Sequence, residues 1–226
     1  MNKSIIKKAF TDTIPVMTGY LALGIGFGVL LRTGGYPWYW APIMAVCIFA
    51  GSMQYVAVTL LTGGANIITT AITTLLVNAR HLFYGISLVE KYKSMGKIKP
   101  YLIFGLTDET YSLVCSTSDE IEHKDRKLYF GLVTLMDHCY WITGCTLGAI
   151  LGGLIKFSTE GIDFVLTALF VSILVDQWLN TKQHIPAITG AVATALCLAI
   201  FGPDNFLIPS MIVITAMLLG LRKKVK

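Results

Sequence analysis

Apolar segments long enough to cross a lipid bilayer recur along the whole chain, and this pattern constrains the fold more than any other feature. A transmembrane helix needs about 20 residues, so a chain of this length provides about seven or eight helical segments. Charged residues make up only 14% of the chain, whereas soluble domains average about 25%. The apolar runs are too long for the alternating strands of an outer-membrane barrel. The sequence therefore predicts a single all-α integral membrane domain over residues 1–226, built as a polytopic helical bundle.

The first apolar segment follows basic residues, as the core of a signal peptide does. It continues to Leu31 without a convincing cleavage site, which predicts an uncleaved first helix over about residues 14–31. Gly24, Gly26 and Gly28 lie inside this helix and follow no strand. They therefore favour close packing between helices over a phosphate-binding loop. The alternative is an unwound segment that faces a ligand.

The segment over residues 74–90 is apolar enough for a membrane and yet carries a cation near its middle. Wound at 100° per residue, its polar side chains share one arc of the helix, and apolar side chains fill the other. A charge at the bilayer centre costs roughly 2.5–3.5 kcal/mol on insertion scales, so it normally faces protein or a watery cavity. The polar arc predicts a substrate-binding face, and the alternative is that Arg80 snorkels or forms a structural ion pair. The face comprises Asn78, Arg80, His81 and Tyr84.

The segment over residues 41–61 contains FAGSMQY, in which Gly51 and Ser52 weaken the helix backbone beside Gln54. Transporters often bind solutes at such breaks, although ordinary packing by small residues explains the motif about as well. Topology points to the same segment, because lysines at the N-terminus and in the loop over residues 91–99 both favour the cytoplasm. Three full crossings cannot connect two cytoplasmic ends. Either one of the first three segments does not cross fully, or one of the two charge signals is misleading. We favour a broken or re-entrant segment, most simply 41–61.

Two further segments, over residues 101–116 and 128–155, place acids at membrane depth. Asp108 or Asp137 could pair with Arg80 as a buried salt bridge that only holds the bundle together. Alternatively, a histidine or a desolvated carboxylate could take up and release protons in a proton-coupled carrier. The candidates for proton coupling or charge balance are Asp108, Glu109, Asp137 and His138.

The remaining segments offer fewer functional residues. Residues 163–179 end near Asp176, which is expected to be structural, while residues 185–201 and 206–221 are expected to be packing or partner-facing helices. A weak similarity between residues 26–35 and 144–153 suggests an internal repeat, which is common in secondary transporters.

Several classes of function lack their motifs in this sequence. There is no P-loop, no H-E-x-x-H and no G-x-S-x-G, and the five cysteines lack metal-ligand spacing. We therefore predict no catalytic residue, no metal and no cofactor. The net charge of +5 lies in loops and the tail, which suits a cytoplasmic membrane face better than nucleic acid. A secondary transporter is favoured; the alternatives are a channel or an assembly subunit and, less favoured, an intramembrane hydrolase.

With these residues in view, the chain resembles the AzlC family of bacterial branched-chain amino acid exporters. The resemblance covers about residues 8–180, with 181–226 as C-terminal helices and a basic tail. It implies efflux of leucine, isoleucine, valine or a similar solute by a multi-pass protein of the bacterial inner membrane, and the buried ionisable residues lead us to expect that the proton gradient drives this efflux. It also implies a small AzlD-like membrane subunit as partner, and leaves homo-oligomerisation open. Arg80 would hold the substrate carboxylate. The motifs are GIGFG (24–28), FAGSMQ (49–54), LLVNARHLFYG (75–85), FGLTDETYSL (104–113), DHCYW (137–141) and DFVLTALFVSILVDQW (163–178), and the substrate-binding candidates within them are Gly51, Ser52, Gln54, Asn78, Arg80, His81 and Tyr84.

Overall fold

All regular secondary structure in the described part of the chain is helical, which confirms the predicted all-α fold. The chain divides into two compact units, Met1–Val165 and Leu166–Lys226, which are treated separately. The number of membrane crossings, the internal repeat and a single domain over residues 1–226 stay predictions. The computed structural model describes residues 3–117, 121–154, 171, 174–175, 178–179, 183–202 and 206–221.

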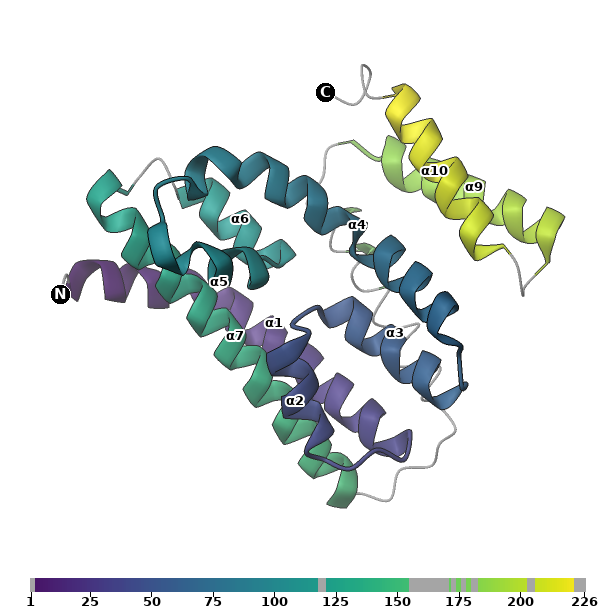
Figure 1. The fold of residues 1–226 in the computed structure, drawn as a ribbon, viewed down its shortest axis with the longest axis horizontal. Coiled ribbons are helices and arrows are strands. Elements are labelled where there is room, and N and C mark those ends of the chain that lie inside the picture. Colours follow the sequence, from purple (N-terminus) through teal and green to yellow (C-terminus); the bar gives the residue numbers. More distant parts are fainter. Residues whose placement is uncertain are drawn as a thin grey trace. The chain divides into compact units, whose positions relative to one another are not determined.

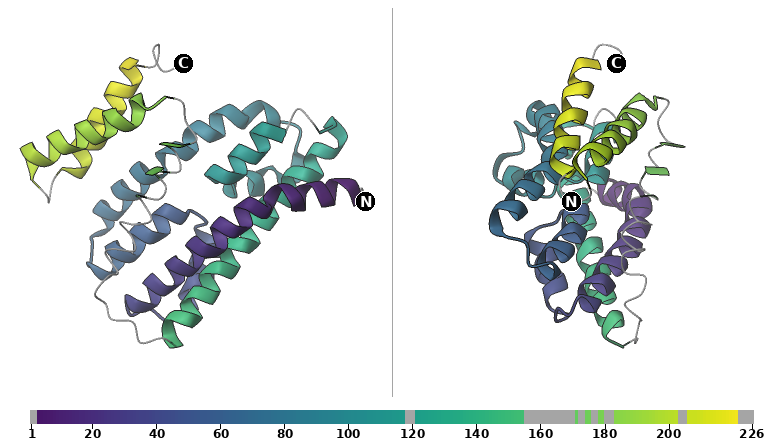
Figure 2. Two further views of the ribbon diagram at one scale, coloured as in Figure 1. Left: turned by 180° about the vertical axis from the view of Figure 1, so that it is seen from behind. Right: turned by 90° about the vertical axis from the view of Figure 1, so that its right-hand side faces the viewer.

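Two long helices, α1 (Lys3–Thr33) and α7 (His123–Leu154), lie side by side in the first unit (Figures 1 and 2). They run parallel, because contacts join their beginnings and their ends in the same order. The Tyr129 hydroxyl donates a hydrogen bond to Asp12 near both beginnings, at 2.6 Å. Arg32 contacts Gly153 near both ends.

Glycines bring the backbones of α1 and α7 into direct contact. A Cβ on Gly28 would overlap the backbone of Cys145 and Ala149, and a Cβ on Gly148 would overlap the backbone of Ile25. Only residues without a side chain permit this separation, as in other small-residue helix contacts. The predicted packing role of Gly24 and Gly28 is therefore confirmed.

The segment over residues 41–61 is broken into α2 (Trp40–Cys47) and α3 (Gly51–Thr62). The break lies at residues 48–50, immediately before Gly51. Phe49 has a φ of 43°, in the left-handed region that non-glycine residues rarely adopt. The sequence had predicted the weak point at Gly51 and Ser52, so the break falls one to three residues earlier than expected.

The helices α2 and α3 form a hairpin that begins and ends near the C-terminal end of α1 (Figure 1). Early in α3, the Tyr55 hydroxyl donates a hydrogen bond to the Leu23 carbonyl in the middle of α1, at 2.6 Å. At the end of α3, Thr62 packs against Gly34, just beyond α1. The chain thus runs to the middle of the α1–α7 pair and returns.

The chain then runs the length of the unit in α4 (Ile67–Tyr92), which begins with Asn66 as its cap. The Asn66 side chain accepts a hydrogen bond from the Thr69 amide at 2.8 Å. The two parts of α4, Ile67–Ala79 and Tyr84–Tyr92, differ in direction by 61°. The bend therefore falls at the predicted polar face.

A second hairpin follows the short helix η1 (Gly96–Ile98) and consists of α5 (Lys99–Phe104) and α6 (Asp108–Thr117). The prediction of one helix over residues 101–116 was wrong, because the chain breaks at residues 105–107. A Cβ on Gly105 would overlap the side chain of Thr134, so α7 leaves room only for glycine.

Local capping explains why a new helix begins after this break. The Thr107 hydroxyl accepts a hydrogen bond from the amide of Thr110 at 3.3 Å, as N-cap threonines do. Asp108 and Glu109 occupy the first turn of α6, where the helix dipole favours negative charge.

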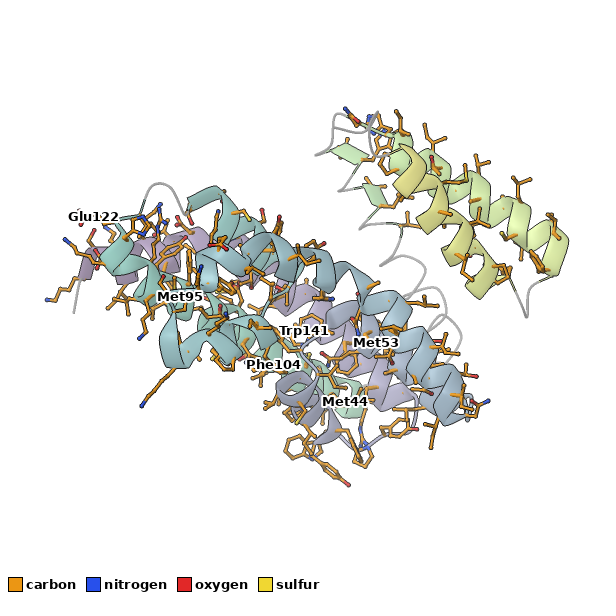
Figure 3. All side chains as sticks on the ribbon, turned by 45° about the horizontal axis from the view of Figure 1, so that its top comes forward. Met44, Met53, Met95, Phe104, Glu122 and Trp141 are labelled. Atoms are coloured by element: carbon orange, nitrogen blue, oxygen red, sulfur yellow. The ribbon has the colours of Figure 1, made fainter. Side chains whose placement is uncertain are left out.

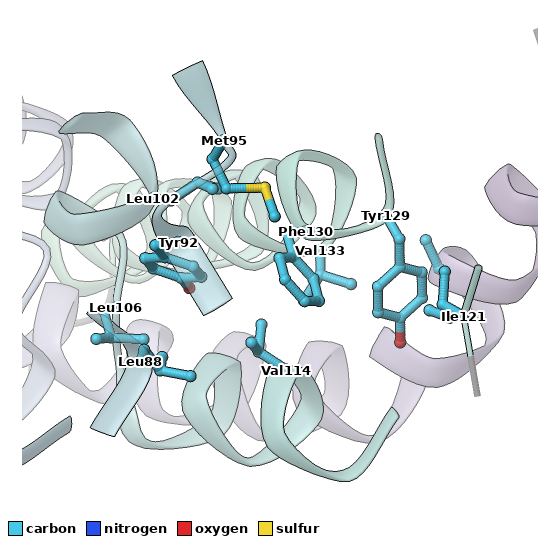
Figure 4. Close-up of a cluster of buried hydrophobic side chains, with 11 residues drawn as sticks. Leu88, Tyr92, Met95, Leu102, Leu106, Val114, Ile121, Tyr129, Phe130 and Val133 are labelled. Carbon is cyan, nitrogen blue, oxygen red and sulfur yellow. The ribbon is translucent and has the colours of Figure 1, made fainter. Parts of the chain in front are cut away.

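The second hairpin lies at the opposite end of the α1–α7 pair from the first (Figures 1 and 2). Its helices share a buried apolar cluster with the beginnings of α1 and α7 and with the end of α4 (Figure 4). The two hairpins therefore enter the unit from opposite ends. The cluster comprises Ala9, Leu88, Tyr92, Met95, Leu102, Leu106, Val114, Ile121, Tyr129, Phe130 and Val133.

In the second unit, α9 (Ile185–Phe201) packs against α10 (Leu207–Leu221), close to the predicted bounds of both helices. Most of residues 163–179, including Asp176, lie outside the described residues. Among the described helices, α1 alone is both long and apolar enough to span a membrane as a single helix, and the two parts of α4 qualify together.

Candidate functional site

One buried face of α7 lies where the two hairpins meet. Thr134, Asp137, His138 and Trp141 are spaced at i, i+3, i+4 and i+7, and their exposed fractions are all below 10%. This spacing places them on the same side of the helix. These four side chains form a polar face of α7 that is directed toward the breaks in the two hairpins, at residues 48–50 and 105–107.

His138 connects the two hairpins. Its Nε2 lies 3.2 Å from the Ala45 carbonyl oxygen on α2, and its Nδ1 lies 3.2 Å from the Tyr101 hydroxyl on α5. Phe49, in the first break, stacks on the imidazole with ring centroids 4.3 Å apart. One side chain of α7 therefore contacts both re-entering segments.

Asp137 terminates a chain of hydrogen bonds that begins on α1. The Tyr20 hydroxyl lies 2.6 Å from the Thr107 hydroxyl and 2.7 Å from a Glu109 carboxylate oxygen. The Thr107 hydroxyl donates to Thr110, and Thr110 donates to Asp137 Oδ2 at 2.7 Å. Asp137 Oδ1 is buried and has no hydrogen-bond partner among the described residues. Two of the predicted coupling residues, Glu109 and Asp137, thus share one network.

Gln54 reaches the same face of α7 from the first hairpin. The indole Nε1 of Trp141 donates a hydrogen bond to Gln54 Oε1 at 2.8 Å. Gln54 is fully buried, and its Nε2 has no hydrogen-bond partner in the described part of the chain. A Cβ on Gly51 would lie 3.2 Å from the Trp141 ring, so the glycine gives the indole room. The position of Trp141 can be followed in Figure 3, where Met53 marks α3 and Phe104 marks α5.

The described side chains on the polar face of α4 contact α6. Tyr84 stacks on Tyr111 with ring centroids 4.6 Å apart, and Ser87 donates a hydrogen bond to the Tyr111 hydroxyl at 3.1 Å. His81 Nδ1 lies 3.2 Å from the Asn78 carbonyl oxygen, one turn earlier in the helix. These contacts hold the bent part of α4 against the second hairpin.

Arg80 lies on α4 at this bend, but its side chain is outside the part of the structure that is described. Its predicted pairing with Asp108 or Asp137 therefore stays a prediction. Ser52 and Asp108 lie in the first turns of α3 and α6, directly after the two breaks.

The structure thus gathers four predicted residues, Gln54, Glu109, Asp137 and His138, around one face of α7. Sequence reasoning missed their partners. Trp141 follows Asp137 by one helical turn within DHCYW, and this spacing was the available signal for it. Tyr20 is a lone phenol in a glycine-rich apolar helix, which gives it a hydroxyl that needs a partner. The residues missed as part of the site are Tyr20, Tyr101, Thr107, Thr110 and Trp141.

The arrangement is suited to binding a small polar solute. A buried polar atom without a partner costs about 1–3 kcal/mol, so the native structure gains when a bound group supplies that partner. Gln54 offers a donor, while Asp137 and Thr134 offer acceptor oxygens without partners among the described residues. Donors and acceptors thus lie within reach of one face of one helix.

Comparisons with known proteins agree with the resemblance seen in the sequence. The family model described as "AzlC protein" matches residues 15–155. The chain is 44% identical over 217 residues to the "Branched-chain amino acid transport protein AzlC" of Bacillus subtilis, covering 96% of this chain and 85% of that protein. It is 36% identical over 222 residues to an "Uncharacterized membrane protein" of Helicobacter pylori, covering 97% and 96%.

A more distant relative is the "Inner membrane protein YgaZ" of Escherichia coli, 26% identical over 204 residues and covering 88% of this chain and 81% of that protein. No solved structure matches the chain. The match of the family model to more than half of the chain, together with the Bacillus subtilis relative, shows that this membrane protein belongs to the AzlC family.

Proposed function

We propose that this protein is the large subunit of a two-component secondary transporter that exports branched-chain amino acids across the bacterial inner membrane. The observation that carries the proposal is the meeting of two helical hairpins, from opposite ends of the α1–α7 pair, at a buried polar face of α7. Secondary transporters use broken helices of this kind to place backbone groups at a central solute site.

The solute class comes from the relatives. The Bacillus subtilis relative is named for branched-chain amino acid transport and matches nearly the whole chain. Leucine, isoleucine and valine are zwitterions with an apolar side chain, so a site for them needs donors, acceptors and an apolar wall. The α7 face supplies the polar groups, and the rings of Phe49 and Trp141 supply apolar surface.

Proton coupling is proposed for the network around Asp137. Tyr20, Thr107 and Thr110 connect Glu109 to Asp137 through hydrogen bonds of 2.6–3.1 Å. Hydroxyl groups in such a chain can pass a proton between two carboxylates by exchanging donor and acceptor roles. Glu109 and Asp137 would bind and release the coupled proton, with Asp108 and His138 balancing charge.

The polar face of α4 is proposed to line the solute pathway beside the second hairpin. Asn78, His81 and Tyr84 contact one another or α6, and Arg80 adds the cation of this face. The second subunit is proposed to be a small AzlD-like membrane protein.

The test is an efflux assay in cells loaded with a leucine-containing dipeptide. We expect leucine to leave the cells fastest when this protein and its small partner are produced together, and a protonophore to slow that efflux. Equal efflux with and without the pair would reject the substrate class. Full efflux with this protein alone would reject the two-component arrangement, and full efflux with the protonophore present would reject proton coupling.

A further inference from the structure

The buried polar atoms without hydrogen-bond partners differ in kind between the first hairpin and α7. Among the described residues, the one on the first hairpin is a donor, Gln54 Nε2, and those on α7 are acceptor oxygens. This difference is built from buried side chains and helix ends in the described part of the chain.

The donor side is the beginning of α3. The first hydrogen bond within α3 runs from the Gln54 amide to the Ala50 carbonyl, at 2.8 Å. The amides of the first turn of a helix point outward along its axis, and at the start of α3 the Ala50 side chain makes no capping hydrogen bond. The helix dipole adds partial positive charge at this end. The fully buried Gln54 side chain adds an Nε2 without a partner among the described residues.

The acceptor side is the middle of α7. Asp137 Oδ1 and Thr134 Oγ1 are buried and lack hydrogen-bond partners within the described residues. They lie one turn apart on the same face of α7. On the second hairpin, α6 begins with a threonine cap and two acids.

The two sides meet α7 at positions about one helical turn apart along its axis. Gln54 is hydrogen-bonded to Trp141, and Gly51 packs on the same indole ring. Trp141 follows Asp137 by four residues on α7, a rise of about 6 Å along the helix axis. An α-amino acid with its hydrogen bonds can bridge a separation of this size.

We propose that α7 and the start of α3 form a binding site for the zwitterionic part of an α-amino acid. The substrate carboxylate binds Gln54 Nε2 at the positively polarised start of α3, and the substrate ammonium donates to Asp137 Oδ1 and Thr134 Oγ1. The proposal rests on the proposed transport function and deepens it, since it names the groups that recognise the backbone of the substrate. It moves the main carboxylate contact from Arg80 to α3.

The test measures binding to the purified full-length chain by displacement of radiolabelled leucine. Three competitors are compared: leucine, leucinol, which lacks the carboxylate, and 4-methylpentanoate, which lacks the ammonium. For the wild-type chain we expect leucine to compete best. Each missing charged group should weaken competition roughly tenfold to a hundredfold, the range of a charge-assisted hydrogen bond.

Two variants assign the groups. Gln54→Leu should weaken competition by leucine and leave competition by leucinol unchanged, so that the difference in affinity between these two competitors shrinks. Asp137→Asn should shrink the difference between leucine and 4-methylpentanoate in the same way. If Gln54→Leu does not fold, Gln54→Glu keeps the acceptor for Trp141 and should repel leucine while leucinol still binds.

Other results overturn the proposal. It fails if both differences in competition persist in the variants. It also fails if Arg80→Ala, instead of Gln54→Leu, removes the preference for leucine over leucinol. Finally, it fails if the wild-type chain does not bind leucine, because water would then satisfy the buried polar atoms. Efflux separates this failure from failure of the proposed function. Binding with the expected pattern but without efflux rejects export alone, whereas efflux with unchanged preferences rejects only the site.

Discussion

Phe49 stacks on the imidazole of His138, with ring centroids 4.3 Å apart and ring planes inclined by 27°. Phe49 adopts a left-handed backbone conformation in the break between α2 and α3, which is unfavourable for a bulky residue. The same imidazole lies within hydrogen-bond distance of α2 and α5. The contact thus holds a strained hairpin tip on α7 and connects it to the second hairpin.

His138→Ala should destabilise the protein, because it removes the stacking on Phe49 and the hydrogen bonds to Ala45 and Tyr101. We expect a loss of roughly 2–4 kcal/mol in the free energy of unfolding, from one aromatic contact and two hydrogen bonds. Thermal unfolding followed by tryptophan fluorescence measures the change. His123→Ala is the matched control, since His123 is exposed at the start of the same helix. Equal stability of the two variants would contradict the role of His138.

Gly28→Ala should also lower stability, through the contact between α1 and α7. A Cβ at this position would overlap the backbone of Cys145 and Ala149, which cannot move aside as a flexible side chain could. Overpacking of this kind costs typically about 1–3 kcal/mol. Gly19→Ala on the same helix is the control, because a Cβ there meets no atom within 4 Å. Melting temperatures and folded yields should fall for Gly28→Ala only.

The sequence predicted the helical elements well where apolar periodicity was strong. The predicted helix over residues 185–201 agrees with α9. The predicted long helix over residues 128–155 ends within one residue of the end of α7, although α7 begins earlier, at His123. The glycine contact was also predictable, since small residues four apart serve mainly to bring helices together. Apolar length and glycine spacing are local properties, so one sequence is enough to read them.

The second break and the site network depend on long-range contacts and were not predictable in the same way. Residues 101–116 are apolar enough for one helix, but Gly105 meets Thr134 of α7 and the chain restarts at the Thr107 cap. Thr107 followed by two acids was a usable start signal. Tyr20 and Glu109, 89 residues apart, are joined only by packing of α1 against the second hairpin, and no local pattern encodes that pairing.

Tyr20→Phe should reduce leucine efflux while leaving the fold intact. The substitution removes the hydroxyl that donates to Thr107 and Glu109. A hydrogen bond to a charged group contributes about 1.5–3 kcal/mol to the stability of the arrangement that it holds. If this network carries the coupled proton, the initial efflux rate should fall several-fold at equal protein level, and the response to an imposed pH gradient should weaken. Tyr39→Phe, at an exposed tyrosine, should behave as wild type. Unchanged coupling in Tyr20→Phe would exclude this network as the proton route.

Arg80 variants separate a binding role of α4 from a purely structural one. Arg80→Lys keeps the charge but loses the planar fork of donors. We expect Arg80→Ala to slow efflux more than Arg80→Lys does, because a cation on the pathway still attracts the substrate. Both variants need to be present at wild-type levels in the membrane. Normal efflux by Arg80→Ala would remove Arg80 from the pathway.

Cysteine labelling tests the hairpin geometry directly. Because α2 and α3 begin and end near the same end of α1, cysteines at Trp38 and Gly64 should react with a membrane-impermeant maleimide from one side of the membrane. A cysteine at Lys97 should react from the other side. The positive-inside rule places the lysines of this loop and those of the N-terminus together on that cytoplasmic side. The measurement uses a chain whose native cysteines are replaced by serine or alanine. Labelling of positions 38 and 64 from opposite sides would mean that residues 40–62 cross the membrane fully, and would reject the re-entrant first hairpin.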